Sequence, residues 1–348
     1  TIMIISRTPF RVSFFGGGTD YPTWFCDHGG KVLTSTINRY CYITARYLPP
    51  FFDQRNRIVW SKIETVDATD EIEHPAVRAG LQFLDVREGV EIHHVGDLPA
   101  RSGLGSSSAF TVGLLHALYA LKGVMANKPR LADDAIYIEQ QMLKEAVGIQ
   151  DQVQVAHGGI NLIEIPCDGK YQISPVIMPL ERTHEFESRL MLFFTGISRF
   201  ASEIAESQIK AIPNKTRELE TMRAMVDEAL HVLVGRGSLD DFGRLLHESW
   251  LLKRSLTSRI SSQKVDDIYE EARRAGAIGG KLLGAGGGGF MLFYVPLAHQ
   301  QQVRDALSKL LEIPFCFEHM GTQIIFCDPG TRGASYNSGY PMMASVAR

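Results

Sequence analysis

Two glycines and three serines, in the segment GLGSSSAF at residues 103–110, stand directly before a stretch that is apolar on almost every side. Residues 109–121 are apolar around nearly the whole circumference of a helix, so we expect this helix to be buried on most sides. The backbone amides at its start have no partner within the helix and carry partial positive charge. Glycines that allow close approach to those amides predict a phosphate site. A simple helix cap by Ser106 or Ser107, worth about 1 kcal/mol, is the alternative interpretation.

Two other glycine clusters flank this segment along the chain. Three consecutive glycines lie in RTPFRVSFFGGGTDY at 7–21, and four lie in KLLGAGGGGFMLFY at 281–294. Taken singly, the first fits a hairpin turn and the second a tight turn between a helix and a strand. The G-x-G-x-x-G spacing in the second is followed by strand-like residues, which disfavours a dinucleotide-binding fold. The P-loop pattern G-x-x-x-x-G-K-[ST] does not occur in the sequence.

Bulk properties restrict the class of protein. A chain of 348 residues is expected to form two domains. The formal net charge of -3 argues against nucleic acid as a partner, so an anionic ligand must meet a local basic pocket. The five cysteines have no C-x-x-C spacing, which argues against a zinc site and a disulfide framework and favours a reducing cytoplasm. No apolar run reaches the length of a membrane span, and we expect no membrane partner.

Residue patterning indicates an α+β layered architecture, with strands followed by helices in a first region and helices between strands in a second. We expect a helix at 132–147 and a boundary between 168 and 189, near a polar stretch that contains Pro166, Pro175 and Pro179. We expect two short strands, at 315–318 and 323–327, to complete the second region. The other expected strands are 2–6, 11–15, 32–37, 41–47, 57–61, 90–95, 160–165, 190–194 and 290–295, and the other expected helices are 215–234, 239–256, 265–275 and 299–311.

The three glycine clusters, in this order and at these separations, resemble the three motifs of the GHMP superfamily, the small-molecule kinases that include galactokinase, homoserine kinase, mevalonate kinase and phosphomevalonate kinase. The segments GGGTDYP, GIQDQVQVAHGG, FFTGISRFASEIA and GGKLLGAGGGGFMLF are most similar to those of the D-glycero-D-manno-heptose 7-phosphate kinases within it. The resemblance implies a two-domain fold. A ribosomal-protein-like α/β domain would span 1–180, a ferredoxin-like α+β domain 181–330 and a tail 331–348.

The same resemblance implies that ATP phosphates bind over the start of the central helix and that Mg²⁺ is required. By its position in the motif, Ser107 would be a magnesium ligand, with Glu139 as its partner. Glu145 is a rival ligand, and a solvated helix face is the alternative for Glu139. Magnesium prefers hard oxygen ligands and needs only one or two protein groups beside phosphates. The nucleotide-binding residues would be Ser102, Gly103, Leu104, Gly105, Ser106, Ser107 and Ser108.

Asp151 matches the catalytic aspartate of the family, and Arg11 matches the basic residue that faces it. Positioning and charge neutralisation carry most of the rate of phosphoryl transfer through a loose transition state. Asp151 is therefore expected to orient the attacking hydroxyl and to accept its proton late. A purely structural Asp–Arg ion pair is the alternative.

Asp20 aligns with the sugar-binding aspartate of the galactokinase-like members. Galactokinases carry Gly-Glu-His where this chain has the glycines 16–18, so the pocket floor is expected to be wider and to suit a seven-carbon sugar. A sugar phosphate also needs cations, although for each candidate a solvated surface charge is the alternative. The expected substrate-binding residues are Asp20, Gly17, Gly18, Gly286, Gly287, Arg199, Lys253, Arg254 and Lys281.

These expectations describe an ATP- and Mg²⁺-dependent kinase that phosphorylates the anomeric hydroxyl of D-glycero-D-manno-heptose 7-phosphate, on the way to nucleotide-activated heptose for surface polysaccharide. One alternative is another anomeric sugar kinase, acting on fucose or galactose. The other is a non-catalytic nucleotide-binding regulator. The sequence does not decide the oligomeric state, and a homodimer is one option.

Overall fold

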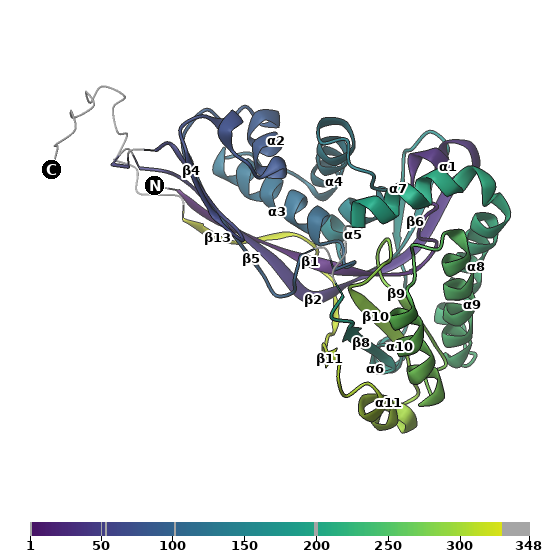
Figure 1. Cartoon of the computed structure of the whole chain (residues 1–348). Helices are drawn as coiled ribbons and strands as arrows, with labels where there is room; N and C mark the ends of the chain where they lie inside the picture. Colours follow the sequence, from purple (N-terminus) through teal and green to yellow (C-terminus); the bar gives the residue numbers. More distant parts are fainter. Residues whose placement is uncertain (1, 50, 53, 101, 198–200, 329–348) are drawn as a thin grey trace.

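Two β-sheets organise the chain (Figure 1), and the computed structural model describes every residue except 1, 50, 53, 101, 198–200 and 329–348. The larger sheet has the order β13-β1-β2-β5-β3-β4, with β6 and β12 also paired to β2 and with β7 paired to β6. Its strands are β1 (Met3–Phe15), β2 (Gly30–Tyr47), β3 (Asn56–Val59), β4 (Ile63–Val66), β5 (Val90–Gly96), β6 (Ile160–Ile165), β7 (Gln172–Pro175), β12 (Phe317–Glu318) and β13 (Gln323–Asp328).

Strands β1 and β2 are long, and each replaces two shorter strands that the sequence predicted. Their antiparallel register shifts between Pro9 and Phe10 and again between Ser13 and Phe15. Proline has no amide hydrogen to donate, so the ladder is interrupted there while the strand continues. Strand β2 pairs with β6 over 30–35 and with β5 over 41–47, which makes it the common support of both ends of the sheet.

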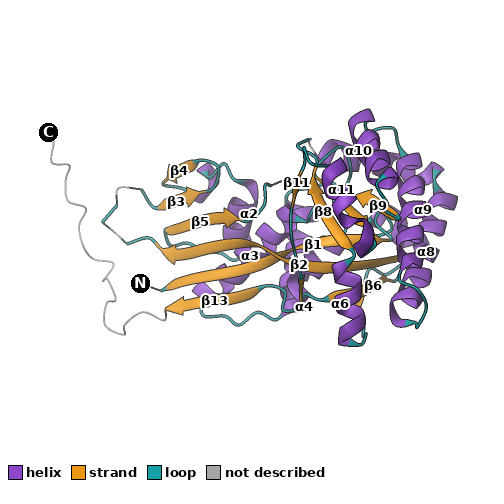
Figure 2. Ribbon diagram, turned by 90° about the horizontal axis from the view of Figure 1, so that it is seen from below, coloured by secondary structure: helices purple, strands orange, loops and turns teal. Residues whose placement is uncertain are grey.

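Helices cover one face of this sheet, and Figure 2 shows α2, α3 and α4 behind its strands. The predicted central helix is confirmed as α3, which contacts both β1 and β2. The predicted helix at 132–147 is wrong at its end, because α4 stops at Tyr137 and a π-helical turn follows, with Lys144 in the left-handed region at φ 54°. The helices are α1 (Pro22–His28), η1 (Thr69–Glu71), α2 (Pro75–Phe83), α3 (Ser106–Leu121), α4 (Lys128–Tyr137), the π-helix η2 (Ile138–Met142) and α5 (Gln150–His157).

The second sheet is antiparallel, in the order β11-β8-β10-β9, and most of the remaining helices lie around it. The predicted helix at 299–311 is shorter than expected, because α11 ends at Ala306 and a short strand follows. The elements are α6 (Leu180–Ser188), β8 (Leu190–Phe194), α7 (Ala201–Ala211), η3 (Ile212–Asn214), α8 (Thr216–Val234), α9 (Asp240–Leu256), α10 (Gln263–Arg274), β9 (Gly279–Leu282), β10 (Phe290–Tyr294), η4 (Leu297–His299), α11 (Gln300–Ala306) and β11 (Leu311–Glu312).

The two short strands expected to complete the second region instead belong to the first sheet. Strand β12 pairs with β2, and β13 pairs with β1 from Met3 opposite Asp328 to Arg7 opposite Gln323. Local residue patterning predicts that a strand exists but not which distant strand it pairs with. The second sheet therefore lies, in sequence, between two parts of the first.

An aromatic cluster joins the two halves. Phe14 on β1 packs edge-on against Phe186 of α6 and Phe242 of α9, with ring centroids 5.6 and 5.5 Å apart. Phe186 also stacks on Phe317 of β12 at 5.6 Å. Such ring pairs add about 0.5–1.5 kcal/mol each beyond the area they bury, so this cluster holds the halves together. Within the described residues, no helix combines the length and apolarity needed to cross a bilayer.

Candidate active site

The start of α3 has no N-cap side chain. Its N-cap residue is Gly105, in the left-handed region at φ 70°. The alternative interpretation of a cap by Ser106 or Ser107 is therefore wrong. The first amides of a helix need acceptors from outside it, and a phosphate oxygen supplies one. Ser107 is exposed in the first turn, whereas Ser102 is buried and its hydroxyl has no hydrogen-bond partner among the described residues.

Arg11, from the segment that carries the first glycine cluster, and the third glycine cluster both contact the loop before α3. The guanidinium of Arg11 donates to the carbonyl of Gly103 at 2.6 Å, and its backbone amide donates to the carbonyl of Leu104 at 2.9 Å. The third cluster packs on the same loop, because a β-carbon on Gly284 would lie 2.5 Å from the Cα of Gly103. A side chain at either position would force the loops apart.

Arg11 and Asp151 form a two-pronged ion pair. Nε of Arg11 donates to Oδ1 of Asp151 and Nη2 donates to Oδ2, each at 2.7 Å. The side chain of Arg11 is 5% exposed and that of Asp151 is 27% exposed, so the carboxylate is the partner that a substrate can reach. A β-carbon on Gly105 would lie 3.3 Å from Oδ2 of Asp151. The structure thus places this carboxylate beside the uncapped start of α3.

Gln150 connects this pair to Asp20. Its side chain donates to Oδ1 of Asp151 at 3.1 Å and accepts from the hydroxyl of Ser13 at 2.8 Å. Its backbone amide donates to Oδ2 of Asp20 at 3.3 Å, and the amide of Gly18 donates to Oδ1 at 3.0 Å. Burial, followed by the charge of Asp151, raises the pKa of Asp20. The sequence analysis missed Ser13 and Gln150, although GIQDQ carries polar residues on both sides of the aspartate.

Glu139 is fully buried where the π-helical turn directs it toward α3. Its Oε2 accepts from the hydroxyl of Ser108 at 2.9 Å and from the side chain of Gln152. Its Oε1 has no partner among the described residues, and neither does Oε1 of Gln152. Burial, followed by the charge of Glu145, raises the pKa of Glu139 to about 7. A buried carboxylate oxygen without a partner suits a hard cation, so the residues present fit Mg²⁺.

No cluster of three or more His, Cys, Asp or Glu side chains suited to a metal occurs in the part of the chain that the structure describes. A magnesium ion at Glu139 would therefore take its other ligands from hydroxyls, phosphates and water, as this ion commonly does. The structure brings Ser108 rather than Ser107 to the carboxylate. Ser107 stays a predicted ligand, exposed in the turn above it.

Two lysines are buried beside these groups. Nζ of Lys253 donates to the carbonyls of Leu282 and Gly284, at 3.2 and 2.5 Å, and Nζ of Lys281 donates to the carbonyl of Phe14 at 2.8 Å. Neither forms an ion pair with a carboxylate among the described residues. Burial, then the charge of Arg11, lowers the pKa of Lys253 to about 7. Burial also lowers the pKa of Lys281, and the charges of Lys253 and Arg11 lower it further.

The structure does not bring Arg254 to this place. Arg254 forms an ion pair with Asp266 of α10 at 2.8 Å. Neighbouring residues on a helix point about 100° apart, so α9 can turn Lys253 inward while Arg254 faces α10. Arg199 lies outside the described residues. Of the predicted glycines, Gly287 donates its amide to the carbonyl of Ile260 at 2.8 Å, which fixes the third cluster against the loop after α9.

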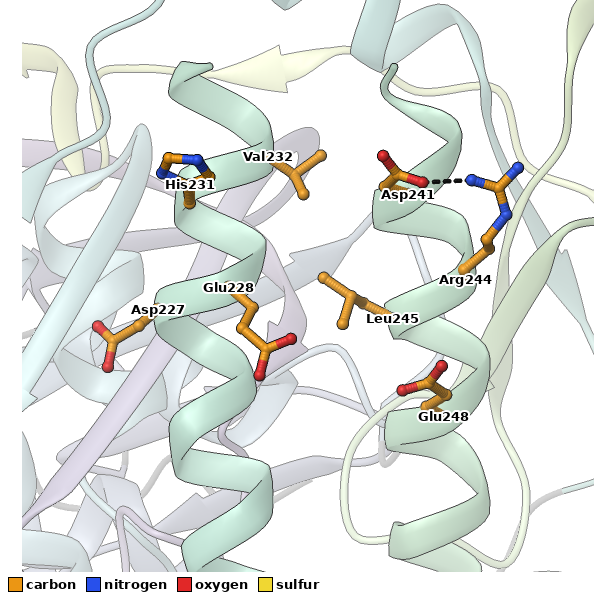
Figure 3. A pocket seen from close by; sticks show the side chains of 8 residues that line it. All are labelled: Asp227, Glu228, His231, Val232, Asp241, Arg244, Leu245 and Glu248. Atoms are coloured by element: carbon orange, nitrogen blue, oxygen red, sulfur yellow. Dashed lines mark hydrogen bonds and ion pairs between the residues drawn. The ribbon is translucent and has the colours of Figure 1, made fainter. Parts of the chain in front are cut away.

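A separate groove of about 600 Å³ runs between α8 and α9 (Figure 3). Glu228 and Leu245 point into it from opposite helices, and Arg244 is paired with Asp241. Its charged lining is mainly acidic, which opposes the binding of a phosphate compound. The residues that line it are Asp227, Glu228, His231, Val232, Asp241, Arg244, Leu245 and Glu248.

Family models match both halves of the chain. The model described as GHMP kinases N terminal domain matches residues 70–159, and the model described as GHMP kinases C terminal matches residues 199–313, together more than half of the chain. The chain belongs to the GHMP kinases. It is accordingly a phosphotransferase that uses ATP, and its two-part α+β fold is the one that the sequence predicted.

Several characterised GHMP kinases are similar to this one over most of its length. It is 28% identical over 323 residues to a D-glycero-alpha-D-manno-heptose 7-phosphate kinase of Campylobacter jejuni, across 88% of this chain and 93% of the relative. It is also 28% identical over 347 residues to an L-fucokinase/L-fucose-1-P guanylyltransferase of Bacteroides fragilis, across 89% of this chain and 36% of the relative. A solved D-glycero-D-manno-heptose 1-phosphate kinase from Bacteroides thetaiotaomicron shares the fold, with a TM-score of 0.76, 24% identity and coverage of 93% and 98%.

Proposed function

We propose that this GHMP kinase transfers the terminal phosphate of ATP to the anomeric hydroxyl of D-glycero-D-manno-heptose 7-phosphate, giving the 1,7-bisphosphate. The observation that carries the proposal is the position of Asp151. Its carboxylate accepts two hydrogen bonds from Arg11 and lies next to Gly105, the N-cap residue of α3. The choice of sugar is supported by the Campylobacter jejuni relative, which is similar over nearly its whole length.

In this proposal the segment 102–108 binds the phosphates of ATP. The amides of the first turn of α3 donate to phosphate oxygens, and the glycines keep side chains out of the way. The buried hydroxyl of Ser102 is available for another such bond. Glu139, with Ser107 or Ser108, would hold Mg²⁺. When bound, this ion neutralises charge on the phosphates and orients them.

Asp151 acts on the acceptor. Its partly exposed carboxylate accepts a hydrogen bond from the anomeric hydroxyl and directs that oxygen at the terminal phosphorus. The new O–P bond forms as the bond to the bridging oxygen of ADP breaks, and the hydroxyl proton passes late to Asp151. Arg11 fixes the carboxylate through two hydrogen bonds and, by its bond to Gly103, ties it to the phosphate loop. Such positioning accounts for much of the rate of phosphoryl transfer.

Asp20 and the two lysines are proposed to bind the rest of the sugar phosphate. Asp20 can accept hydrogen bonds from two hydroxyls. Lys253 and Lys281 are buried without a carboxylate partner among the described residues, and an anionic ligand would stabilise their charged forms. Their hydrogen bonds to carbonyls leave further donors on each ammonium group.

A substrate comparison tests this proposal. ADP release should be fastest with heptose 7-phosphate, and phosphorus NMR of the product should place the new phosphate on the anomeric carbon. The similarity to the L-fucokinase/L-fucose-1-P guanylyltransferase of Bacteroides fragilis, over 36% of that protein, makes fucose the rival acceptor. Turnover of free fucose or galactose without turnover of heptose 7-phosphate would replace the proposed substrate.

The variant Asp151→Asn tests the catalytic role against that of a non-catalytic regulator. The amide keeps the size of the carboxylate but cannot accept the proton, so kcat should fall by roughly two to four orders of magnitude. Binding of ATP should change little, because the phosphate loop itself is unaltered. Wild-type protein that binds ATP but transfers phosphate to no sugar would favour the regulator.

A further inference from the structure

Gln208 interrupts an apolar stripe that runs along α7 and into η3, the short helix that follows it. Ile204 and Ile212 stand four residues before and after it, and both are 4% exposed. Residues four apart share one face of a helix, so an apolar side chain is expected at the position between them. Gln208 is instead a polar residue that is only 3% exposed.

The side chain of Gln208 lies against the first glycine cluster. Its Nε2 is 3.1 Å from the point where a β-carbon on Gly18 would stand, and Leu219 of α8 is 3.4 Å from that point. The space left by the absent side chain at Gly18 is therefore bordered by an amide from the second half of the chain. A larger residue at 18 would meet this amide directly.

Asp20 borders the same glycine from the other side. The amide of Gly18 donates to Oδ1 of Asp20, so Asp20 and Gln208 both contact one residue. No hydrogen bond joins the amide of Gln208 to another side chain or carbonyl within the described parts of the chain. The amide therefore keeps its donors and its acceptor available for a ligand.

We propose that Gln208 is a specificity-determining residue of the acceptor site. Its amide both donates and accepts, and it binds a sugar hydroxyl next to those bound by Asp20. A neutral amide matches a hydroxyl, whereas the buried lysines match a phosphate. The inference rests on the proposed sugar kinase function. The second half of the chain, through Gln208 of α7, then contributes to recognition of the sugar.

The position of α7 supports this role. The hydroxyls of Ser207 and Thr257 lie 3.3 Å apart, which links α7 to the end of α9. Ile204 and Ile212 anchor the helix in the core on either side of Gln208. The amide is thus presented from a fixed backbone rather than from a loop.

The test compares Gln208→Met, which keeps the length of the side chain but removes both polar atoms, with Glu206→Gln, an exposed position on the same helix. The acceptor is the sugar that the wild type phosphorylates fastest. We expect Gln208→Met to raise KM for that sugar on the order of 10-fold, the factor that one net hydrogen bond contributes. KM for ATP and the melting temperature should stay near the wild-type values, and Glu206→Gln should change neither KM.

Free heptose, used as substrate or competitive inhibitor beside heptose 7-phosphate, separates a hydroxyl contact from a phosphate contact. Equal loss of affinity for both compounds supports the proposal. Loss for the phosphorylated compound alone, an unchanged KM for the sugar, or a parallel rise in KM for ATP overturns it. If the wild type prefers a sugar other than heptose 7-phosphate, the proposed substrate fails, while the same variant still tests Gln208 on the preferred sugar.

Discussion

Two glycine-to-alanine substitutions at opposite ends of α3 separate backbone strain from damage to the site. Gly105 and Gly123 have nearly the same left-handed conformation, with φ of 70° and 72°. An L-residue in this region costs about 1–2 kcal/mol, so each substitution should lower stability by a similar amount. For a domain of this size that corresponds to a fall in melting temperature of about 2–8 °C.

The surroundings of the two positions differ. A β-carbon at Gly123 meets nothing within 4 Å, whereas one at Gly105 would lie 3.0 Å from Cγ of Arg11 and 3.3 Å from Oδ2 of Asp151. Arg11 is held by three hydrogen bonds from its guanidinium, so it can move away only by shifting Asp151 or the carbonyl of Gly103. Misplacement of a reacting group by up to 1 Å lowers the rate by up to about 100-fold.

We therefore expect Gly105→Ala to lower kcat about 10- to 100-fold and Gly123→Ala to leave it within about twofold of the wild-type value. The assay is coupled ADP release with saturating ATP and acceptor, at a temperature at least 15 °C below the lower melting point. Full kcat in Gly105→Ala would refute the close placement of the phosphate loop and Asp151. An equal loss of kcat in both variants would show that strain in α3, rather than contact with the site, controls the rate.

Three further predictions concern groups around the site. Because the pKa of Lys253 is lowered to about 7, KM for the phosphorylated acceptor should rise up to about tenfold per pH unit above pH 7 in the wild type. In Lys253→Arg the KM for the phosphorylated acceptor should not depend on pH. A wild-type KM that is independent of pH would contradict a role of Lys253 in binding the phosphate. The pKa of Glu139, raised from 4.5 to about 7, means that the ion-free protein loses stability as the pH rises from about 4.5 to about 7. Glu139→Gln should abolish that loss of stability, which melting temperatures from pH 5 to 8 can test. The same variant should weaken the dependence of activity on Mg²⁺. Ser13→Ala removes the hydrogen bond that holds the side chain of Gln150, so Asp151 loses only a positioning contact. We expect kcat to fall about 3- to 10-fold with KM for ATP unchanged. A change confined to KM for ATP would contradict this positioning role.

The centre of the site could be predicted because its residues are close in sequence to unusual glycine patterns. The apolar stretch at 109–121 predicted a buried helix, which the structure confirms. The phosphate site that the glycines predicted at its start stays a prediction. Arg11 and Asp151 were paired on the strength of a resemblance, and the structure joins them by two hydrogen bonds. Their catalytic role stays a prediction.

What the sequence did not reveal depends on contacts between distant segments. Glu139 faces inward because a π-helical turn changes the helical phase after Tyr137. No residue pattern in the sequence predicted this turn. Arg254 was grouped with Lys253 on charge alone, although adjacent helix positions face different neighbours. Gln208 could have been found, since a polar residue in the middle of an apolar stripe is visible in the sequence of α7.

The pairing of β13 with β1 affects how the protein is made. During synthesis the ribosome releases β1 early, but the strand that covers its outer edge becomes available only after residue 328. Until then the nascent chain presents an uncovered strand edge, which is prone to pair with other chains. A fragment that stops near residue 180 would keep this exposed edge permanently, so we expect the first half, expressed by itself, to aggregate unless residues 317–328 are supplied with it.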